Sequence, residues 1–517
     1  MARLRRALHG VASSYLLLAA SAVCSLVSVS IALHYLDTDR FGLWALMSSI
    51  VGYLTLVDAG INGSAARLMI DHKDERIGGV YGGFLKAVII VTTLQGLIIF
   101  LVGTALAGWF AQLLAIPAEL HSEFTRLLTQ QCAIMGIGFS MRLFGLILSG
   151  HQRMDLVNYA GICSQLVNLV TLWVFFHLGC GVFSLSWAAG CAAVTSLSFQ
   201  AISCGVLKFF PGRGNWGKVS GARFKEIFNF AKDVFLVSIG NQLIMASQTL
   251  VITRTLGLSS AGLWNVGLRI FNLVNQLIWR VSDMSWPALS EMLARKEIVL
   301  LRKRYHSLAV LSFSLAGWAA VSFAVCNSLF VTIWTHGKMF WPMENDWLLA
   351  VWMILQSIIH CHNCFVLMTK QIGFMRYIYF VEGVVFVTAC FIAAPLGGLP
   401  AIIGCSIVCA TVFSGAYGVW RTAHFFGIHV REVAFGWLRP MFLLILFYVP
   451  VVALVYWAMY SAPGVVRLAA NAVLALSLGA FLFLRFGIPG AFQSELLVRA
   501  PRIALPVLRK VFPRTAH

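Results

Sequence analysis

Apolar runs of about 18 residues or more recur along this 517-residue chain, and they constrain its fold more than any other feature. Each run is long enough to cross the hydrocarbon core of a bilayer as a helix. A transmembrane β-barrel would need strands in which apolar and polar residues alternate, and these runs do not alternate. Only 11% of the residues are charged, whereas a soluble domain carries about 25%. The sequence therefore predicts an all-α, polytopic membrane protein.

The runs predict about fourteen membrane-spanning helices. Their approximate ranges are 11–35, 41–62, 84–108, 127–148, 156–178, 183–204, 232–253, 262–285, 308–335, 346–368, 374–397, 400–420, 437–460 and 463–486.

The basic residues fall mostly on one side of this topology. The chain has 38 Lys and Arg against 19 Asp and Glu, for a net charge of +19. With the N-terminus in the cytoplasm, the outer loops hold only Arg40, Arg126, Arg254, Lys338 and Arg467. Such a bias orients membrane proteins, and it predicts that both termini are cytoplasmic. The basic charge is thus explained by topology and lipid attraction, and we expect no nucleic-acid partner.

The tripeptide Gly-Leu-Trp occurs twice, at residues 42–44 and 262–264. Each copy follows a short outer loop and opens a helix that runs inward. The two helices are six apart in our numbering, so both copies have the same orientation. This pattern predicts a parallel repeat of two six-helix bundles. The alternative is that each Trp is a generic anchor at the membrane interface.

The repeat suggests a division of the chain into five parts. We expect a six-helix lobe at 1–210, a basic cytoplasmic linker at 211–231 and a second six-helix lobe at 232–424. Two additional spans at 437–486 and a basic cytoplasmic tail at 487–517 complete the plan.

The opening of the chain resembles bacterial polysaccharide flippases of the Wzx type. The resemblance lies in Tyr35-Leu36, in Phe41-Gly42-Leu43-Trp44, in Asp58-Ala59-Gly60 and in Arg67, within about the first 70 residues. The superfamily of these flippases also contains multidrug (MATE) exporters and the lipid II flippase. The resemblance implies two lobes around a cavity that opens alternately to each side of the bacterial inner membrane. It also implies an undecaprenyl-pyrophosphate-linked oligosaccharide as cargo.

A flippase for such a cargo needs polar groups for the sugar and cations for the pyrophosphate, because an unpaired polar group costs about 2–7 kcal/mol in hydrocarbon. Arginine binds phosphate oxygens with two parallel hydrogen bonds. Charged residues inside spans usually face a cavity or a partner. The candidate substrate-binding residues are Arg269, Arg142, Arg280, Asn241, Gln242 and Gln248.

Several further polar residues inside or near spans are candidates for ion coupling or for contacts between lobes. They are Asp58, Asn62, Arg67, Asp283 and Glu382. Asp58 and Asn62 share a helical face, and a structural bond between helices explains Asp58 equally well. Arg280 and Asp283 are close enough along the helix to pair. The sequence leaves proton, sodium or gradient-only coupling open, and it predicts no cofactor.

The stretch His360-Cys361-His362-Asn363-Cys364 looks like a metal cluster, but two ligands on one helical turn do not make a four-ligand site. We therefore predict no metal site. Most of the twelve cysteines lie within apolar spans, so no disulfide framework is indicated.

The hypothesis is a flippase rather than an enzyme. There is no P-loop for ATP, and the outer loops are too short to hold a catalytic domain. Two alternatives remain: an ion-coupled multidrug or cation antiporter of the same fold, and a membrane glycosyltransferase or polymerase. A weaker possibility is a scaffold in a polysaccharide assembly complex, and polymerase or assembly proteins are expected partners of a flippase as well.

Overall fold

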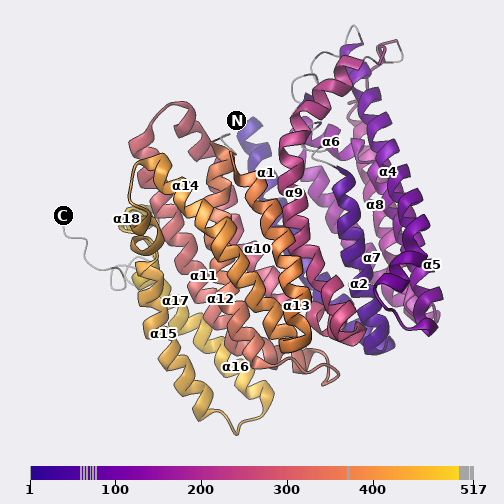
Figure 1. Ribbon diagram of the computed structural model, residues 1–517. Coiled ribbons are helices and arrows are strands. Elements are labelled where there is room, and N and C mark those ends of the chain that lie inside the picture. The colour runs from indigo at the N-terminus through magenta and orange to yellow at the C-terminus, as the bar shows by residue number, and fades with distance from the viewer. Residues whose placement is uncertain are drawn as a thin grey trace. The chain divides into compact units, whose positions relative to one another are not determined.

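The computed structural model describes residues 2–58, 79–212, 214–219, 221–369 and 373–499, and single residues among 61–75 and at 512. Every regular element in this part of the chain is a helix (Figure 1). A bilayer offers no water to peptide groups, so a spanning segment must satisfy its own hydrogen bonds, as a helix does. The predicted all-α membrane fold is confirmed.

Twelve helices in the described part of the chain are long and apolar enough to cross a membrane. One of them, Met375–Phe426, is interrupted at Gly398, whose φ of 61° is not helical and which lies between Pro395 and Pro400. That range therefore contains two helices, as the sequence predicted. A further helix at Leu258–Ala294 has 37 residues but is too polar to belong to the twelve. The split of Met375–Phe426 and the addition of Leu258–Ala294 bring the total to about fourteen spans.

The chain forms two compact units, Met1–Gly262 and Leu263–His517. In the first unit the elements are α1 (Ala2–Tyr35), α2 (Thr38–Leu54), η1 (Thr55–Asp58), α4 (Val80–Leu113), α5 (Ala118–Ser140), α6 (Leu143–Gly150), α7 (Met154–His177), α8 (Phe183–Val206) and α9 (Gly221–Leu256).

The helix α10 (Leu258–Ala294) begins in the first unit and continues in the second. The other elements of the second unit are α11 (Ile298–Trp334), α12 (Met343–Met368), α13 (Met375–Ala410), η2 (Thr411–Gly415), α14 (Ala416–Phe426), η3 (Glu432–Gly436), α15 (Arg439–Ala458), α16 (Gly464–Leu474), η4 (Ala475–Gly479), α17 (Ala480–Leu482), η5 (Phe483–Gly487) and α18 (Gly490–Arg499).

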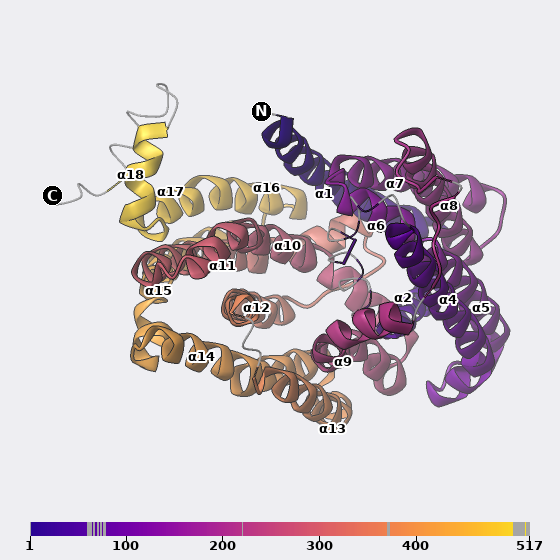
Figure 2. The same cartoon turned by 90° about the horizontal axis from the view of Figure 1, so that it is seen from above.

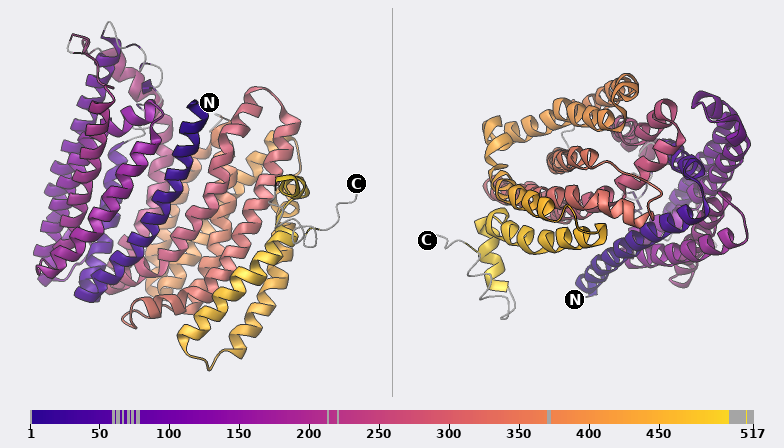
Figure 3. Two further views of the ribbon diagram at one scale, coloured as in Figure 1. Left: turned by 180° about the vertical axis from the view of Figure 1, so that it is seen from behind. Right: turned by 90° about the horizontal axis from the view of Figure 1, so that it is seen from below.

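Close helix packing builds the first unit. The helix α1 lies along α7, and α4 lies along α5 (Figure 3). A Cβ added at Gly96 of α4 would lie 2.2 Å from the carbonyl oxygen of Gly136 in α5. Such small residues let membrane helices approach closely, because packing contacts rather than exclusion of water hold them together.

In the second unit, α12 lies among α11, α13 and α14 (Figure 2). The last two spans pack against α11 and are tied to it by side chains. The indole nitrogen of Trp318 donates to the carbonyl of Ala475 at 2.9 Å, and the amide of Asn471 donates to the carbonyl of Val325 at 2.9 Å. Both bonds join α11 to the last membrane-spanning segment.

The two Gly-Leu-Trp copies meet through their glycines. A Cβ added at Gly42 would lie 2.0 Å from the carbonyl oxygen of Leu258, and one added at Gly262 would lie 3.3 Å from the Cα of Gly42. The glycines therefore let the two helices approach closely at this point. The parallel repeat stays a prediction.

Residues 214–219, which lie within the predicted linker 211–231, contact the start of α4. A Cβ added at Gly82, near the start of α4, would lie 2.4 Å from the carbonyl oxygen of Asn215. In addition, α9 packs against α2, and the hydroxyl groups of Tyr53 and Ser247 are hydrogen-bonded. These contacts explain why the first compact unit extends to Gly262. The predicted division into six, six and two helices stays a prediction.

Candidate functional site

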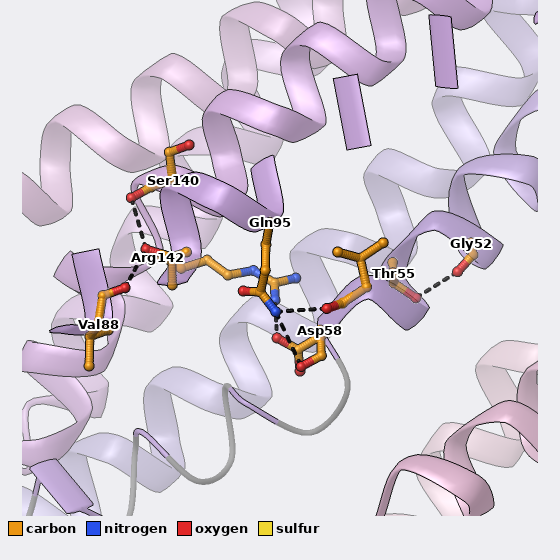
Figure 4. Close-up of polar contacts among 9 residues, drawn as sticks. Gly52, Thr55, Asp58, Val88, Gln95, Ser140 and Arg142 are labelled. Carbon is orange, nitrogen blue, oxygen red and sulfur yellow. Dashed lines mark hydrogen bonds and ion pairs between the residues drawn. The ribbon is translucent and has the colours of Figure 1, made fainter. Parts of the chain in front are cut away.

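The polar centre of the first unit is an ion pair between Asp58 and Arg142. The guanidinium Nη1 of Arg142 lies 2.9 Å from Asp58 Oδ1 (Figure 4). The guanidinium carbon lies 3.5 Å from the centre of the Phe139 ring. Both residues of the ion pair are partly buried. Asp58 ends η1, and Arg142 separates α5 from α6. Each of the two side chains therefore has a partner of opposite charge.

Side chains of α4 satisfy the backbone around this pair. The amide of Gln95 donates to the carbonyls of Val57 at 2.7 Å and Asp58 at 3.3 Å (Figure 4). The Thr92 hydroxyl donates to the carbonyl of Val88 at 2.9 Å and approaches that of Ser140 at 3.5 Å. Side chains of α4 therefore donate hydrogen bonds to backbone carbonyls next to both members of the ion pair.

The three candidate substrate-binding residues of α9 differ in how far they are buried. Asn241 is exposed, Gln242 is half-buried and Gln248 is buried. Gln242 packs against α2, since a Cβ added at Gly52 would lie 2.9 Å from its Nε2. Asn62 and Arg67 lie outside the described residues.

In the second unit, α10 presents a continuous polar face. Its residues are spaced by three or four positions and therefore lie on one side of the helix: Arg269, Asn272, Gln276, Arg280 and Asp283. Arg269 is half-buried and the other four are exposed. The opposite face is buried and includes Phe271, Ile278 and Ser282. We name these five residues the α10 polar face.

Sequence reasoning found three members of the α10 polar face as separate charges and missed Asn272 and Gln276. The spacing alone would have revealed them. The ion pair expected between Asp283 and Arg280 is replaced by a different contact. Asp283 instead accepts a hydrogen bond from Nε2 of His360 in α12, at 2.9 Å.

Glu382 of α13 is buried beside a π-helical turn. Its Oε2 accepts from the backbone nitrogen of Ser414 at 3.0 Å, and its Oε1 lies 3.2 Å from the Ser414 hydroxyl. The π-helical turn Thr411–Gly415 supplies that backbone N–H. Turns of this kind often occur at functional sites. The arrangement gives the second unit a membrane carboxylate that is held in place by one neighbouring residue.

More than half of the chain matches the model of a known protein family. A family model described as "Polysaccharide biosynthesis protein" matches residues 7–293. No curated protein sequence matches the chain.

Solved transporter structures share the fold at low sequence identity. An inward-facing multidrug resistance MATE-family transporter of the MOP superfamily has a TM-score of 0.64 and 15% identity, over 78% of this chain and 95% of that one. Lipid II flippase MurJ, in an inward closed conformation, has a TM-score of 0.66 and 12% identity, over 91% and 99%. A MOP-superfamily transporter from Pyrococcus furiosus has a TM-score of 0.52 and 14% identity, over 81% and 96%.

These likenesses concern the fold, whereas the family model rests on the sequence itself. The chain belongs to the polysaccharide biosynthesis protein family, and it has the fold of MOP-superfamily transporters.

Proposed function

We propose that this protein is a flippase for undecaprenyl-pyrophosphate-linked oligosaccharide repeat units. It moves them from the cytoplasmic to the outer leaflet of the bacterial inner membrane, for the synthesis of O-antigen, capsule or exopolysaccharide. Both termini face the cytoplasm, transport proceeds by alternating access, and the protein acts as a transporter rather than an enzyme. Polysaccharide polymerase and assembly proteins are its expected partners.

The observation that carries this proposal is the α10 polar face. A helix of 37 residues has a length of about 55 Å, enough to cross a membrane. On such a helix, exposed Asn272, Gln276 and Arg280 would be costly against lipid, and polar residues in spans usually line a water-filled path. Amides suit sugar hydroxyls and guanidinium groups suit pyrophosphate. One helix thus offers both kinds of group that this cargo requires.

Arg142 offers a second cation in the first unit. Its partner in the structure is Asp58. A phosphate oxygen is a chemically equivalent acceptor for the same guanidinium N–H groups. In our proposal, pyrophosphate competes with Asp58 for Arg142 during transport.

The test is flipping in vesicles that contain the purified protein and a fluorescent undecaprenyl-pyrophosphate glycan. Arg269→Ala and Arg280→Ala each remove one guanidinium from the α10 polar face. A charged hydrogen bond contributes about 1.5–3 kcal/mol, so each variant should slow flipping about tenfold or more.

Arg295→Ala is the matched control. Arg295 follows α10 and forms an exposed ion pair with Glu291, so its loss should leave the flipping rate unchanged. Wild-type rates in both α10 variants would make these arginines structural. An absence of flipping with any polyprenyl glycan would refute the proposed function.

The second candidate is an ion-coupled multidrug or cation antiporter. Buried Glu382 favours it, because such a protein needs a membrane carboxylate that exchanges a proton or sodium ion. Organic-cation uptake into the same vesicles, driven by a proton or sodium gradient and abolished by Glu382→Gln, would establish this function. Gradient-independent flipping of the glycan would exclude that assignment.

A further inference from the structure

The side chains of Asp283, His360 and Cys364 converge in the second unit. One ligand atom from each lies within 4.8 Å of the other two. Asp283 Oδ1 is 2.9 Å from His360 Nε2, and that nitrogen is 3.7 Å from the Cys364 sulfur. The sequence shows only the pair on α12. The third ligand comes from α10, 77 positions earlier in the chain.

These distances are close to those of a tetrahedral zinc site. Bonds of about 2.3 Å to sulfur and 2.1 Å to nitrogen place the two ligand atoms about 3.6 Å apart. The observed separation of 3.7 Å already matches this value. The oxygen and nitrogen would have to separate from 2.9 Å to about 3.4 Å. Asp283 is exposed, so a small rotation of its side chain can supply that change.

The histidine is held by groups other than the three ligands. Its ring stacks on Trp279 with centroids 4.7 Å apart and an interplanar angle of 10°. Trp279 precedes Asp283 by four positions, so α10 supplies both the platform and the carboxylate. The stacked indole limits rotation of the imidazole ring about its side-chain bonds. Neighbouring Cys361 takes no part, because its sulfur lies 3.8 Å from the Tyr305 hydroxyl.

The charges of the three side chains also suit a divalent cation. A thiolate and a carboxylate together carry two negative charges, which a divalent cation neutralises. Net neutrality lowers the cost of charge among apolar helices. Histidine, cysteine and carboxylate together are ligands typical of Zn²⁺.

We propose that Asp283, His360 and Cys364 bind one Zn²⁺ or a closely related divalent metal ion. The fourth coordination position is open to water or another small ligand. The metal ion joins α10 to α12 through Asp283, which is the last residue of the α10 polar face. This inference does not depend on the transported substrate.

The test uses the whole purified protein, with any histidine tag removed, after treatment with a chelator. Titration with Co²⁺ should produce a thiolate-to-cobalt charge-transfer band, saturating at about one ion per chain. Cys364→Ser should abolish that band. Cys361→Ser, the same change three residues away, should retain it. Asp283→Asn should weaken binding at least about tenfold.

A second measurement needs no variant. Zn²⁺ should remain bound through dialysis at about one ion per chain and should raise the unfolding midpoint of the wild type, since it binds only the folded site. No thiolate band in the wild type, or a band that persists in Cys364→Ser, would overturn the proposal. In that event the three residues form only a hydrogen-bonded contact between helices.

Discussion

Gly42 shows at the residue scale how little space separates the helices of the first unit. A Cβ there would overlap the carbonyl group of Leu258, which belongs to the backbone and cannot rotate away. The sequence revealed the repeated tripeptide but could not reveal this contact. The missing information was which residues of two distant helices face each other.

Gly42→Ala should therefore destabilise the protein. Overpacking costs about 1–3 kcal/mol, which exceeds the gain of about 1 kcal/mol in helix propensity from glycine to alanine. The measurement is the unfolding midpoint of the purified protein in detergent. Gly108→Ala is the control, because a Cβ at that helical position meets nothing within 4 Å. Equal midpoints for both variants would mean that the helices separate easily at Gly42.

The ion pair of Asp58 and Arg142 should show energetic coupling. In a double-mutant cycle with Asp58→Asn and Arg142→Gln, each single change leaves one charge without its partner. We expect a coupling energy of about 1–3 kcal/mol in unfolding. The exposed pair of Glu291 and Arg295 should give about 0.5 kcal/mol or less in the same cycle. Additive effects at Asp58 and Arg142 would argue against a structural pair.

At the scale of elements, α10 explains which parts of the site could be read from the sequence. Arg269, Arg280 and Asp283 were recognised because charges inside spans are rare. Asn272 and Gln276 were missed because uncharged residues were weighed only in helices thought to line the cavity. The partner of Asp283 could not be predicted, since His360 belongs to another helix and only packing brings the two together.

The uncharged residues of the α10 polar face can be tested separately from its arginines. Gln276→Leu should slow flipping of the glycan about fivefold or more, because one lost sugar hydrogen bond contributes about 0.5–1.5 kcal/mol and the apolar side chain also excludes water. Its unfolding midpoint should stay unchanged, since Gln276 is exposed. Gln112→Leu, the same change at an exposed position of α4, should flip at the wild-type rate. Normal flipping by Gln276→Leu would remove that residue from the transport path.

On the scale of the whole molecule, the fold was largely predictable. Hydropathy predicts an all-α membrane fold and the approximate ends of its spans, because only helices and closed β-barrels can cross a bilayer. The break at Gly398 was also predictable, because the apolar runs suggest that one span ends near residue 397 and the next begins near 400. The position at which the first compact unit ends, Gly262, was not predictable, because it depends on how α9 packs against α2.

The proposed direction of transport predicts a response to voltage. An inside-negative potential favours outward movement of negative charge by about 2.3 kcal/mol per charge per 100 mV. A potassium diffusion potential of that sign across vesicles should therefore speed outward flipping of the anionic cargo, and the opposite sign should slow it. A neutral lipid carried by the same vesicles provides the control. Voltage-independent flipping would mean that the pyrophosphate crosses with its charge neutralised.

The turn between α9 and α10 has a consequence for how the protein is made. The two helices are separated by one residue, Gly257, whose φ of 90° reverses the chain. A single residue spans about 3.8 Å, which is far less than the thickness of a bilayer. The adjoining ends of the two helices must therefore stay at the same level of the membrane while they insert. We expect the pair to enter as one hairpin during synthesis. A nascent chain that stalls after Leu256 would lack α10, and insertion of α9 should then wait until α10 has been made.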